Sequence, residues 1–371
     1  MGDMWFIFRP DARIVWRYRE VKERLGWYKA VMDNKMPAKY LIAKRVPTDL
    51  EPSTATLSEL WREHEKLGKV FMDMWGKIRE GEAKLEDYQV PSRSFLDVKI
   101  EIVKRLLEEC VFCERRCKVN RVKGEKGACG LDARTRVASW FHHMGEEAPL
   151  VPSGTIFFTG CSFKCVFCQN WDISQYPENG VEVTPKELAS MAEVLRKEGV
   201  RNINYVGGNP DQQLHTIIES LKYMNINVPL LWNSNFYMTE EAMKILIHVI
   251  DIWLPDFKYG NNECAQRLSG VPRYFEVVTR NLHTASKYGD MIIRHLVLPG
   301  HLECCTKPVL KWIAEHCSNA LVNIMAQYRP EFLVRKFPEK WPEIYSRVSS
   351  EEMHQAYKLA EKLGIIYKPV S

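Results

Sequence analysis

The stretch Cys161-Ser162-Phe163-Lys164-Cys165-Val166-Phe167-Cys168 decides how the chain is interpreted. It sets three cysteines in a C-x3-C-x2-C spacing, directly after an apolar stretch at 155–160 that is typical of a β-strand. Three thiolates on one tight loop can each bind one iron of a cubane cluster, which ordinarily has four thiolate ligands. The loop therefore favours a cluster whose fourth iron is open to a ligand that is not part of the protein. A zinc knuckle completed by one further residue is the structural alternative.

The chain after residue 150 alternates apolar and amphipathic stretches in a regular order. Six apolar stretches are predicted to be strands: 155–160, 202–206, 228–233, 250–255, 291–298 and 321–326. Helical patterns follow most of them, at 185–198, 211–224, 239–249, 272–287 and 307–314. Such alternation forms a parallel sheet with right-handed crossovers, and six units fall short of a closed eightfold barrel. We therefore predict an α/β fold, a partial (β/α)6 TIM-type barrel that is open on one side.

Glycines and polar residues stand at the ends of the predicted strands. They are, in chain order, Cys161; Gly207, Gly208, Asn209 and Pro210; Asn233 and Asn235; Asp256 and Lys258; and Arg294. In barrels of this type the C-terminal ends of the strands carry the chemistry. We therefore expect these residues to face one opening together with the three cysteines.

This pattern resembles the radical SAM superfamily, in which a [4Fe-4S] cluster cleaves S-adenosylmethionine (SAM). The resemblance implies that Cys161, Cys165 and Cys168 bind the cluster and that SAM chelates its open iron. The residues implied to bind SAM are Phe167, Gly207, Gly208, Asn209, Pro210, Asn233 and Asn235. Phe167 would lie near the adenine, and the glycine-rich element would receive the amino group of SAM. Most relatives have glutamate where this chain has Asn209, and a neutral amide accepts from an ammonium less strongly than a carboxylate does.

Three charged residues extend the resemblance to one branch of the superfamily. Asp256, Lys258 and Arg294 are similar to residues that surround SAM and the substrate peptide in the activating enzymes of pyruvate formate-lyase. They are the candidate catalytic residues.

The resemblance implies reductive cleavage of SAM to a 5′-deoxyadenosyl radical, which abstracts hydrogen from a protein or peptide substrate. A small electron-donor protein of the ferredoxin or flavodoxin type is the expected partner. Radical modification of a small metabolite or cofactor is the alternative, with the N-terminal region shaping the substrate site. A non-catalytic iron–sulfur or zinc scaffold is a third reading.

A second set of cysteines precedes the barrel. Cys110, Cys113, Cys117 and Cys129 begin with a CxxC and suit one tetrahedral ion, Zn or Fe, or a second Fe–S cluster. With the segments around it, this set resembles uncharacterised iron–sulfur homologues of pyruvate formate-lyase activating enzyme, over roughly residues 92–350.

Four regions are expected along the chain. They are an N-terminal helical region at 1–93, the four-cysteine metal-binding segment at 94–150, the partial barrel at 151–332 and a C-terminal closing helix at 333–371. Within them, helices are predicted at 14–32, 57–80, 94–109 and 350–363.

Composition and charge narrow the protein class further. Hydrophobic residues make up 46% and charged residues 27%, and the net charge of +5 does not indicate a nucleic-acid partner. The chain shows neither an apolar run long enough to cross a membrane nor a secretory signal, so we expect a cytoplasmic protein. Its 11 cysteines, an odd number, favour metal or catalytic use over a disulfide framework.

One further pair of cysteines stands after the fifth predicted strand. Cys304 and Cys305 are adjacent, and vicinal thiols at the barrel mouth could donate hydrogen in radical chemistry. Two buried apolar cysteines are the alternative.

Overall fold

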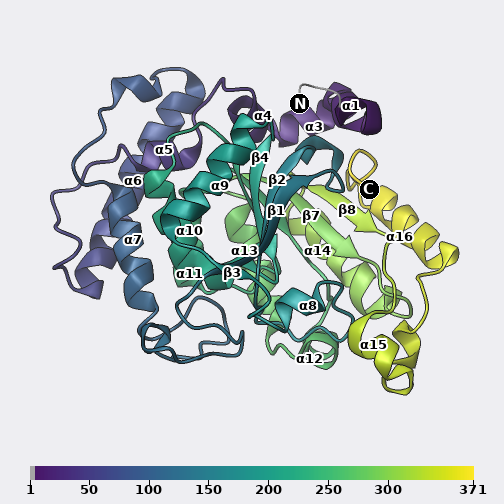
Figure 1. The fold of residues 1–371 in the computed structure, drawn as a ribbon. Coiled ribbons are helices and arrows are strands. Elements are labelled where there is room, and N and C mark those ends of the chain that lie inside the picture. The colour runs from purple at the N-terminus through teal and green to yellow at the C-terminus, as the bar shows by residue number, and fades with distance from the viewer. Residues whose placement is uncertain (1–4) are drawn as a thin grey trace.

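The structure is a computed structural model and describes residues 5–371 around one eight-stranded sheet (Figure 1). The strands are β1 (Arg136–His143), β2 (Ser153–Phe158), β3 (Val181–Glu182), β4 (Asn202–Gly207), β5 (Leu230–Ser234), β6 (Ile252–Pro255), β7 (Asp290–Leu296) and β8 (Leu321–Met325). They lie in the order β3-β1-β2-β4-β5-β6-β7-β8. The six strands from β2 to β8 in this order are parallel to one another. They are the six predicted strands, so the α/β partial barrel is confirmed.

Two strands were not predicted. β1 pairs antiparallel with β2, and the short β3 pairs antiparallel with β1. They lengthen the sheet beyond β2, at the edge farthest from β8.

Five of the helices that connect the parallel strands match the predicted ones, and α8 and α12 are additional. The helices are α1 (Trp5–Phe8), α2 (Asp11–Ile14), α3 (Arg19–Arg24), α4 (Gly26–Met32), α5 (Lys39–Ala43), α6 (Leu57–Glu80), α7 (Phe95–Leu106), α8 (Trp171–Ser174), α9 (Pro185–Lys197), α10 (Leu214–Tyr223), α11 (Glu240–Leu246), α12 (Asn262–Ser269), α13 (Tyr274–Ala285), α14 (Lys307–His316), α15 (Phe332–Lys336) and α16 (Ser350–Lys362). Among the described residues, no helix combines the length and apolar character that crossing a membrane requires.

The predicted single helix at 14–32 is wrong. Tyr18 has an extended backbone (φ −69°, ψ 129°), which separates a short 3-10 turn at Val15–Arg17 from α3. By contrast, α6 has the predicted bounds because Thr56 and Glu59 form a capping box at its start and Gly81 adopts a left-handed conformation after its end.

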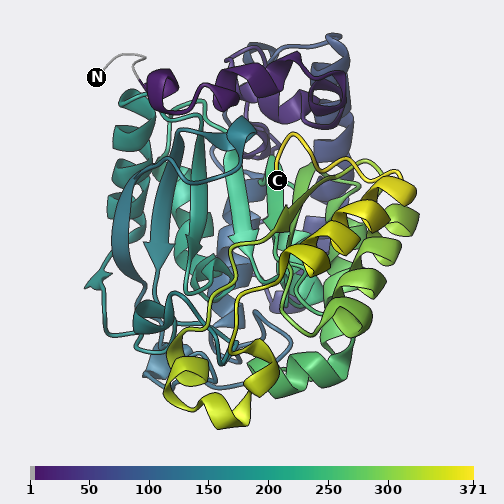
Figure 2. The same ribbon diagram turned by 90° about the vertical axis from the view of Figure 1, so that its right-hand side faces the viewer.

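Helices α1 to α4 lie across the end of the barrel opposite α8, which follows the cluster loop, whereas α6 packs beside α7 along the side of the barrel (Figures 1 and 2). Asp251, buried just before β6, joins the two parts. Its carboxylate accepts hydrogen bonds from the Trp27 indole at 2.8 Å and from the backbone N–H groups of Lys39 at 3.1 Å and Leu230 at 2.9 Å. Trp27 and Trp75 also pack edge to face in the apolar core that this region shares with the barrel. A buried carboxylate is costly unless it is hydrogen-bonded, so Asp251 depends on the N-terminal region for two of these three donors.

The C-terminal residues run beside β8 at the other edge of the sheet. The backbone N–H of Val322 donates to the Ile366 carbonyl at 3.0 Å, and that of Ile324 donates to the Ser371 hydroxyl at 2.8 Å. These contacts satisfy part of an edge that would otherwise expose unpaired backbone groups.

We expect Trp27→Ala to lower the free energy of unfolding by about 3–5 kcal/mol, because it removes a buried aromatic ring and one partner of Asp251. Urea unfolding followed by circular dichroism measures the change. Val90→Ala, at an exposed site in the same region, is the control and should stay within about 0.5 kcal/mol of wild type. Equal stabilities of the two variants would contradict the prediction.

Candidate active site

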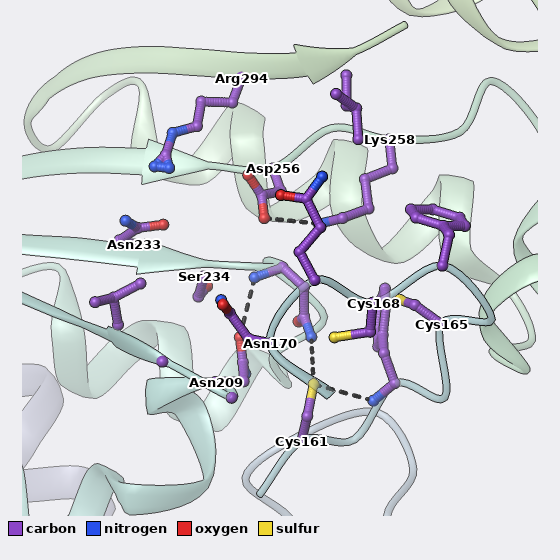
Figure 3. A pocket seen from close by; sticks show the side chains of 18 of the residues that line it. Cys161, Cys165, Cys168, Asn170, Asn209, Asn233, Ser234, Asp256, Lys258 and Arg294 are labelled. Carbon is purple, nitrogen blue, oxygen red and sulfur yellow. Dashed lines mark hydrogen bonds and ion pairs between the residues drawn. The ribbon is translucent and has the colours of Figure 1, made fainter. Parts of the chain in front are cut away.

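The three cysteines of the predicted cluster loop follow β2 and precede α8, and their sulfurs face one opening (Figure 3). Each sulfur has a polar neighbour. The Asn235 amide donates to Cys161 Sγ at 3.6 Å, Ser269 Oγ lies 2.9 Å from Cys165 Sγ, and Ser174 Oγ lies 3.2 Å from Cys168 Sγ. Such contacts orient metal-binding thiolates and stabilise their charge.

Burial sets the protonation of this loop. It raises the pKa of all three thiols, that of Cys165 to about 11. Buried thiols with raised pKa values ionise readily only when a cation compensates their charge. The donor set therefore fits iron, and three sulfurs from one loop fit a cluster with one open position.

A cavity of about 240 Å³ opens in front of the loop. Its lining includes every residue predicted to act on the cluster, on SAM or in catalysis except Pro210: Cys161, Cys165, Phe167, Cys168, Gly207, Gly208, Asn209, Asn233, Asn235, Asp256, Lys258 and Arg294. Pro210 begins a buried 3-10 turn, Pro210–Gln213, directly behind this lining. The strand ends therefore bring the predicted residues together at one opening.

Gly207 and Gly208 bring the end of β4 against the neighbouring backbone. A Cβ atom at Gly207 would lie 2.3 Å from the backbone N and O of Phe158, and one at Gly208 would lie 2.3 Å from the Gly160 carbonyl oxygen. Gly207 also has a φ of +121°. A side chain at either position would push β4 away from the cluster loop, which explains the two glycines.

Amide groups line the side of the cavity next to these glycines. Asn209 Oδ1 accepts from the Asn235 backbone N–H at 3.1 Å, and its Nδ2 donates to Gln212 at 3.1 Å. Asn233 Nδ2 is buried and has no hydrogen-bond partner among the described residues. Because a buried unpaired amide is costly, this group fits a site that receives a polar ligand. Phe167 packs edge to face on Tyr328 at 5.6 Å.

Asp256 and Lys258 form an ion pair of 2.6 Å at the cavity wall (Figure 3). Burial disfavours the charged amine, but the Asp256 carboxylate together with the charges of Cys165 and Cys161 outweighs it, and the pKa of Lys258 is raised. Lys258 therefore stays a cation near the cysteines.

Arg294 points into the barrel interior, where it meets two adjacent carboxylates. Its guanidinium contacts Glu146 and Glu147, each at 3.1 Å, and Asn323 donates to Glu147 at 2.8 Å. Burial opposes ionisation of both acids; the Arg294 charge nevertheless lowers the pKa of Glu146, whereas burial raises that of Glu147. These residues line a second cavity of about 800 Å³, which shares seven lining residues with the first, among them Asn170, Asn233 and Arg294.

The four upstream cysteines lie in the loop between α7 and β1. Burial raises the pKa of Cys113 and Cys129. The loop folds back on itself here, since the Lys118 N–H donates to the Cys110 carbonyl at 3.1 Å and the Ala128 N–H, next to Cys129, donates to Cys117 Sγ at 3.3 Å. Arg115 ties this loop to the cluster loop by donating to the Ser162 carbonyl at 3.0 Å. Metal binding by the four thiols stays a prediction.

Some contacts of the site were not predicted from the sequence. Ser174 and Ser269 touch cluster cysteines, but single serines carry no spacing signal. Glu146 and Glu147 precede β2, at the end of the barrel away from the cluster loop, and the sequence places them only on the approach to the SAM site, without their contact to Arg294.

We expect Gly208→Ala to lower the free energy of unfolding by about 1–3 kcal/mol, because the added methyl overlaps the Gly160 backbone. Thermal unfolding measures the change, and the visible absorption of reconstituted protein reports the cluster loop. Gly76→Ala in α6 is the control, since its Cβ meets nothing within 4 Å and alanine favours helix. Equal stability of Gly208→Ala and wild type would contradict the proposed overlap.

Comparison with known proteins identifies a relative that spans most of the chain and others that match part of it. Residues 155–313 match the family described as the radical SAM superfamily. An uncharacterised protein of Methanocaldococcus jannaschii is 43% identical over 352 residues, covering 93% of this chain and 99% of its own. Pyruvate formate-lyase 1-activating enzyme of Escherichia coli K12 is 27% identical over 150 residues, 39% of this chain and 60% of that protein. A crystal structure of a domain of pyruvate-formate lyase-activating enzyme from Bacteroides vulgatus aligns with a TM-score of 0.32 and 13% identity, covering 49% of this chain and 89% of that one. With the barrel and the cluster loop described above, the family match shows that this chain belongs to the radical SAM superfamily.

Proposed function

We propose that this radical SAM enzyme abstracts hydrogen from a protein or peptide substrate, as an activating enzyme does. The observation that supports the proposal is the junction of the two cavities. The small cavity beside the cysteines and the large one in the barrel share Asn170, Asn233 and Arg294, so a substrate group can approach the cluster loop from the barrel interior.

The residues of the small cavity have separable roles in this proposal. When bound, the [4Fe-4S] cluster and SAM supply reductive C–S cleavage and a carbon-centred radical. The cluster loop would hold the iron, Gly207 and Gly208 would let the ligand approach the backbone, and the Asn233 amide would donate to it. The Asp256–Lys258 pair keeps a cation close to the thiolates, which lowers the cost of their charge.

A peptide substrate is supported by the surface beside this opening. Trp171, which follows the cavity residue Asn170, is partly exposed and stacks on Phe332 at 5.5 Å. Exposed aromatic groups beside a catalytic opening are suited to bind a peptide. The sequence likeness to pyruvate formate-lyase 1-activating enzyme supports the same substrate class. A ferredoxin-type or flavodoxin-type protein would supply the electron.

A small metabolite or cofactor is the second candidate substrate, and the large cavity favours it. Arg9, Asp11 and Tyr18 of the N-terminal region line the cavity together with Glu146 and Glu147. A volume of about 800 Å³ lies within the usual range for small-molecule sites. The N-terminal region would then shape the substrate site.

We expect anaerobically reconstituted, reduced protein to release 5′-deoxyadenosine from SAM, and Cys161→Ala to abolish this release because it removes one of three cluster ligands. Chromatography of the products measures the yield, and iron analysis reports the cluster. Cys317→Ser, a buried cysteine outside the candidate metal sets, should keep the wild-type yield. A Cys161→Ala variant that keeps the wild-type yield would refute the cluster assignment.

A substrate that occupies the barrel interior should respond to Glu147. With a deuterated substrate, we expect Glu147→Gln to lower the ratio of deuterium in 5′-deoxyadenosine to SAM cleaved by about tenfold, because it removes a buried charge from the cavity wall. Glu80→Gln, at an exposed site on α6, is the control.

The same measurement distinguishes the two substrate classes. Deuterium transfer from labelled peptides supports the first candidate, and transfer from labelled small molecules supports the second. An unchanged ratio in Glu147→Gln would place the substrate outside the barrel interior.

A further inference from the structure

A third group of cysteines lies outside the active-site lining. Cys264 stands in the first turn of α12, while His301, Cys304 and Cys305 belong to the connection between β7 and α14. Their ligand atoms all lie within 4.8 Å of one another. Neither the cluster loop nor the four-cysteine segment contributes to this group.

The distances within the group are those of a tetrahedron around one ion. Cys304 Sγ lies 3.8 Å from Cys264 Sγ and 3.9 Å from Cys305 Sγ. His301 Nδ1 lies 3.6, 3.3 and 3.7 Å from the sulfurs of Cys264, Cys304 and Cys305. Zinc bonds of about 2.3 Å to sulfur and 2.0–2.1 Å to nitrogen give tetrahedral edges of about 3.8 Å between sulfurs and 3.5 Å between sulfur and nitrogen. The S–S separations are far too long for a disulfide, whose bond is about 2.0 Å.

The local backbone explains how three of these residues converge. His301, Cys304 and Cys305 are spaced i, i+3 and i+4, which sets them on one face of a helical turn. That turn, Leu302–Thr306, is π-helical, and it is anchored by a 2.9 Å hydrogen bond from the Cys305 N–H to the His301 carbonyl. Such π-helical turns are frequent at functional sites.

Polar neighbours orient the ligands from outside. Asn261 donates its amide N–H to Cys264 Sγ at 3.4 Å, and its oxygen accepts from the Cys264 N–H at 2.8 Å. The His301 side chain is 6% exposed, and its Nε2 has no hydrogen-bond partner among residues 5–371. Glu343 Oε1 lies 3.9 Å from that nitrogen. A carboxylate on the far side of a metal-binding imidazole is a common supporting contact.

We propose that Cys264, His301, Cys304 and Cys305 bind one Zn²⁺ ion. Three thiolates and one imidazole in tetrahedral arrangement suit zinc, and four protein ligands leave no open position, so the site is structural. Cys304 and Cys305 therefore face Cys264 and His301 and do not line the cavity at the barrel mouth.

The ion would hold α12 in place, and α12 in turn contacts the cluster loop. Cys264 lies near the start of this helix and Ser269 at its end, where the Ser269 hydroxyl contacts Cys165 Sγ at 2.9 Å and the Tyr259 hydroxyl at 2.6 Å. At Gly260, a Cβ atom would lie 2.7 Å from the Cys304 carbonyl, so the segment after β6 already touches the π-helical turn. Zinc would join these two segments beside the cluster loop.

The first test compares metal content in purified full-length variants. We expect Cys264→Ser/Cys304→Ser to contain about one zinc per chain less than wild type by mass spectrometry of metals, because two of four ligands are lost. Cys317→Ser, a buried cysteine outside the group, should keep the wild-type content. A folded double variant with wild-type zinc content would overturn the proposal. Any zinc in the four-cysteine segment is common to wild type and variant, so the difference in zinc content between them reports this group alone.

The second test uses the wild-type protein and does not depend on a variant that folds. Anaerobic alkylation followed by peptide mapping reports each cysteine separately. We expect Cys264 and Cys304, which are only half-buried, to resist alkylation in zinc-loaded protein and to react after a chelator removes the ion. Equal reaction before and after chelation, or a disulfide within the group in freshly isolated protein, would overturn the proposal. Neither readout involves SAM, so its failure is distinct from failure of the proposed function.

Discussion

The active site depends on the close contact of the Gly207-Gly208 backbone with the C-terminal end of β2 and with Gly160 just after it. At Gly208 the distance leaves no room for a Cβ atom against the Gly160 carbonyl. Because β2 and β4 are paired in parallel up to Phe158 and Gly207, the cluster loop begins at the position where β4 ends. The cavity, the amides of Asn209 and Asn235 and the sulfur of Cys161 all follow from this junction. A larger residue would separate the iron-binding loop from the amides that face it.

Much of the fold could be predicted because the parallel strands are buried on both faces and so appear as continuous apolar stretches. β1 escaped prediction because its burial is uneven, with Trp140 and Phe141 exposed on an edge of the sheet. The helix predicted at 14–32 failed at Tyr18, whose extended backbone interrupts it, while Val15 and Val21 on either side are buried against residues of the barrel strands. Amphipathic spacing indicates which side of a segment is buried, but it does not predict where a helix is interrupted.

The candidate site shows the same division. The cluster cysteines and the strand-end residues follow a local spacing or a position in the barrel, so the sequence suffices to find them. Ser269 reaches Cys165 across 104 residues, and Cys264 reaches Cys304 across 40. These pairs depend on how α12 lies against the cluster loop and the π-helical turn, which is a property of the packed fold.

The hydrogen bonds of Asp251 limit how far the chain can be shortened from its N-terminus. Burial raises the pKa of Asp251 to about 6, and that of Asp290, which accepts from the Tyr28 N–H at 2.8 Å, to about 7. A chain cut after the first 40 residues would keep both acids but lose Trp27, Tyr28 and Lys39 as partners. The Asp251 and Asp290 carboxyl groups would then lie among apolar residues at the end of the barrel, without the hydrogen-bond donors that the N-terminal region supplies. A shortened version of this enzyme therefore needs both acids replaced together with the N-terminal region, because that region supplies most of their hydrogen-bond donors.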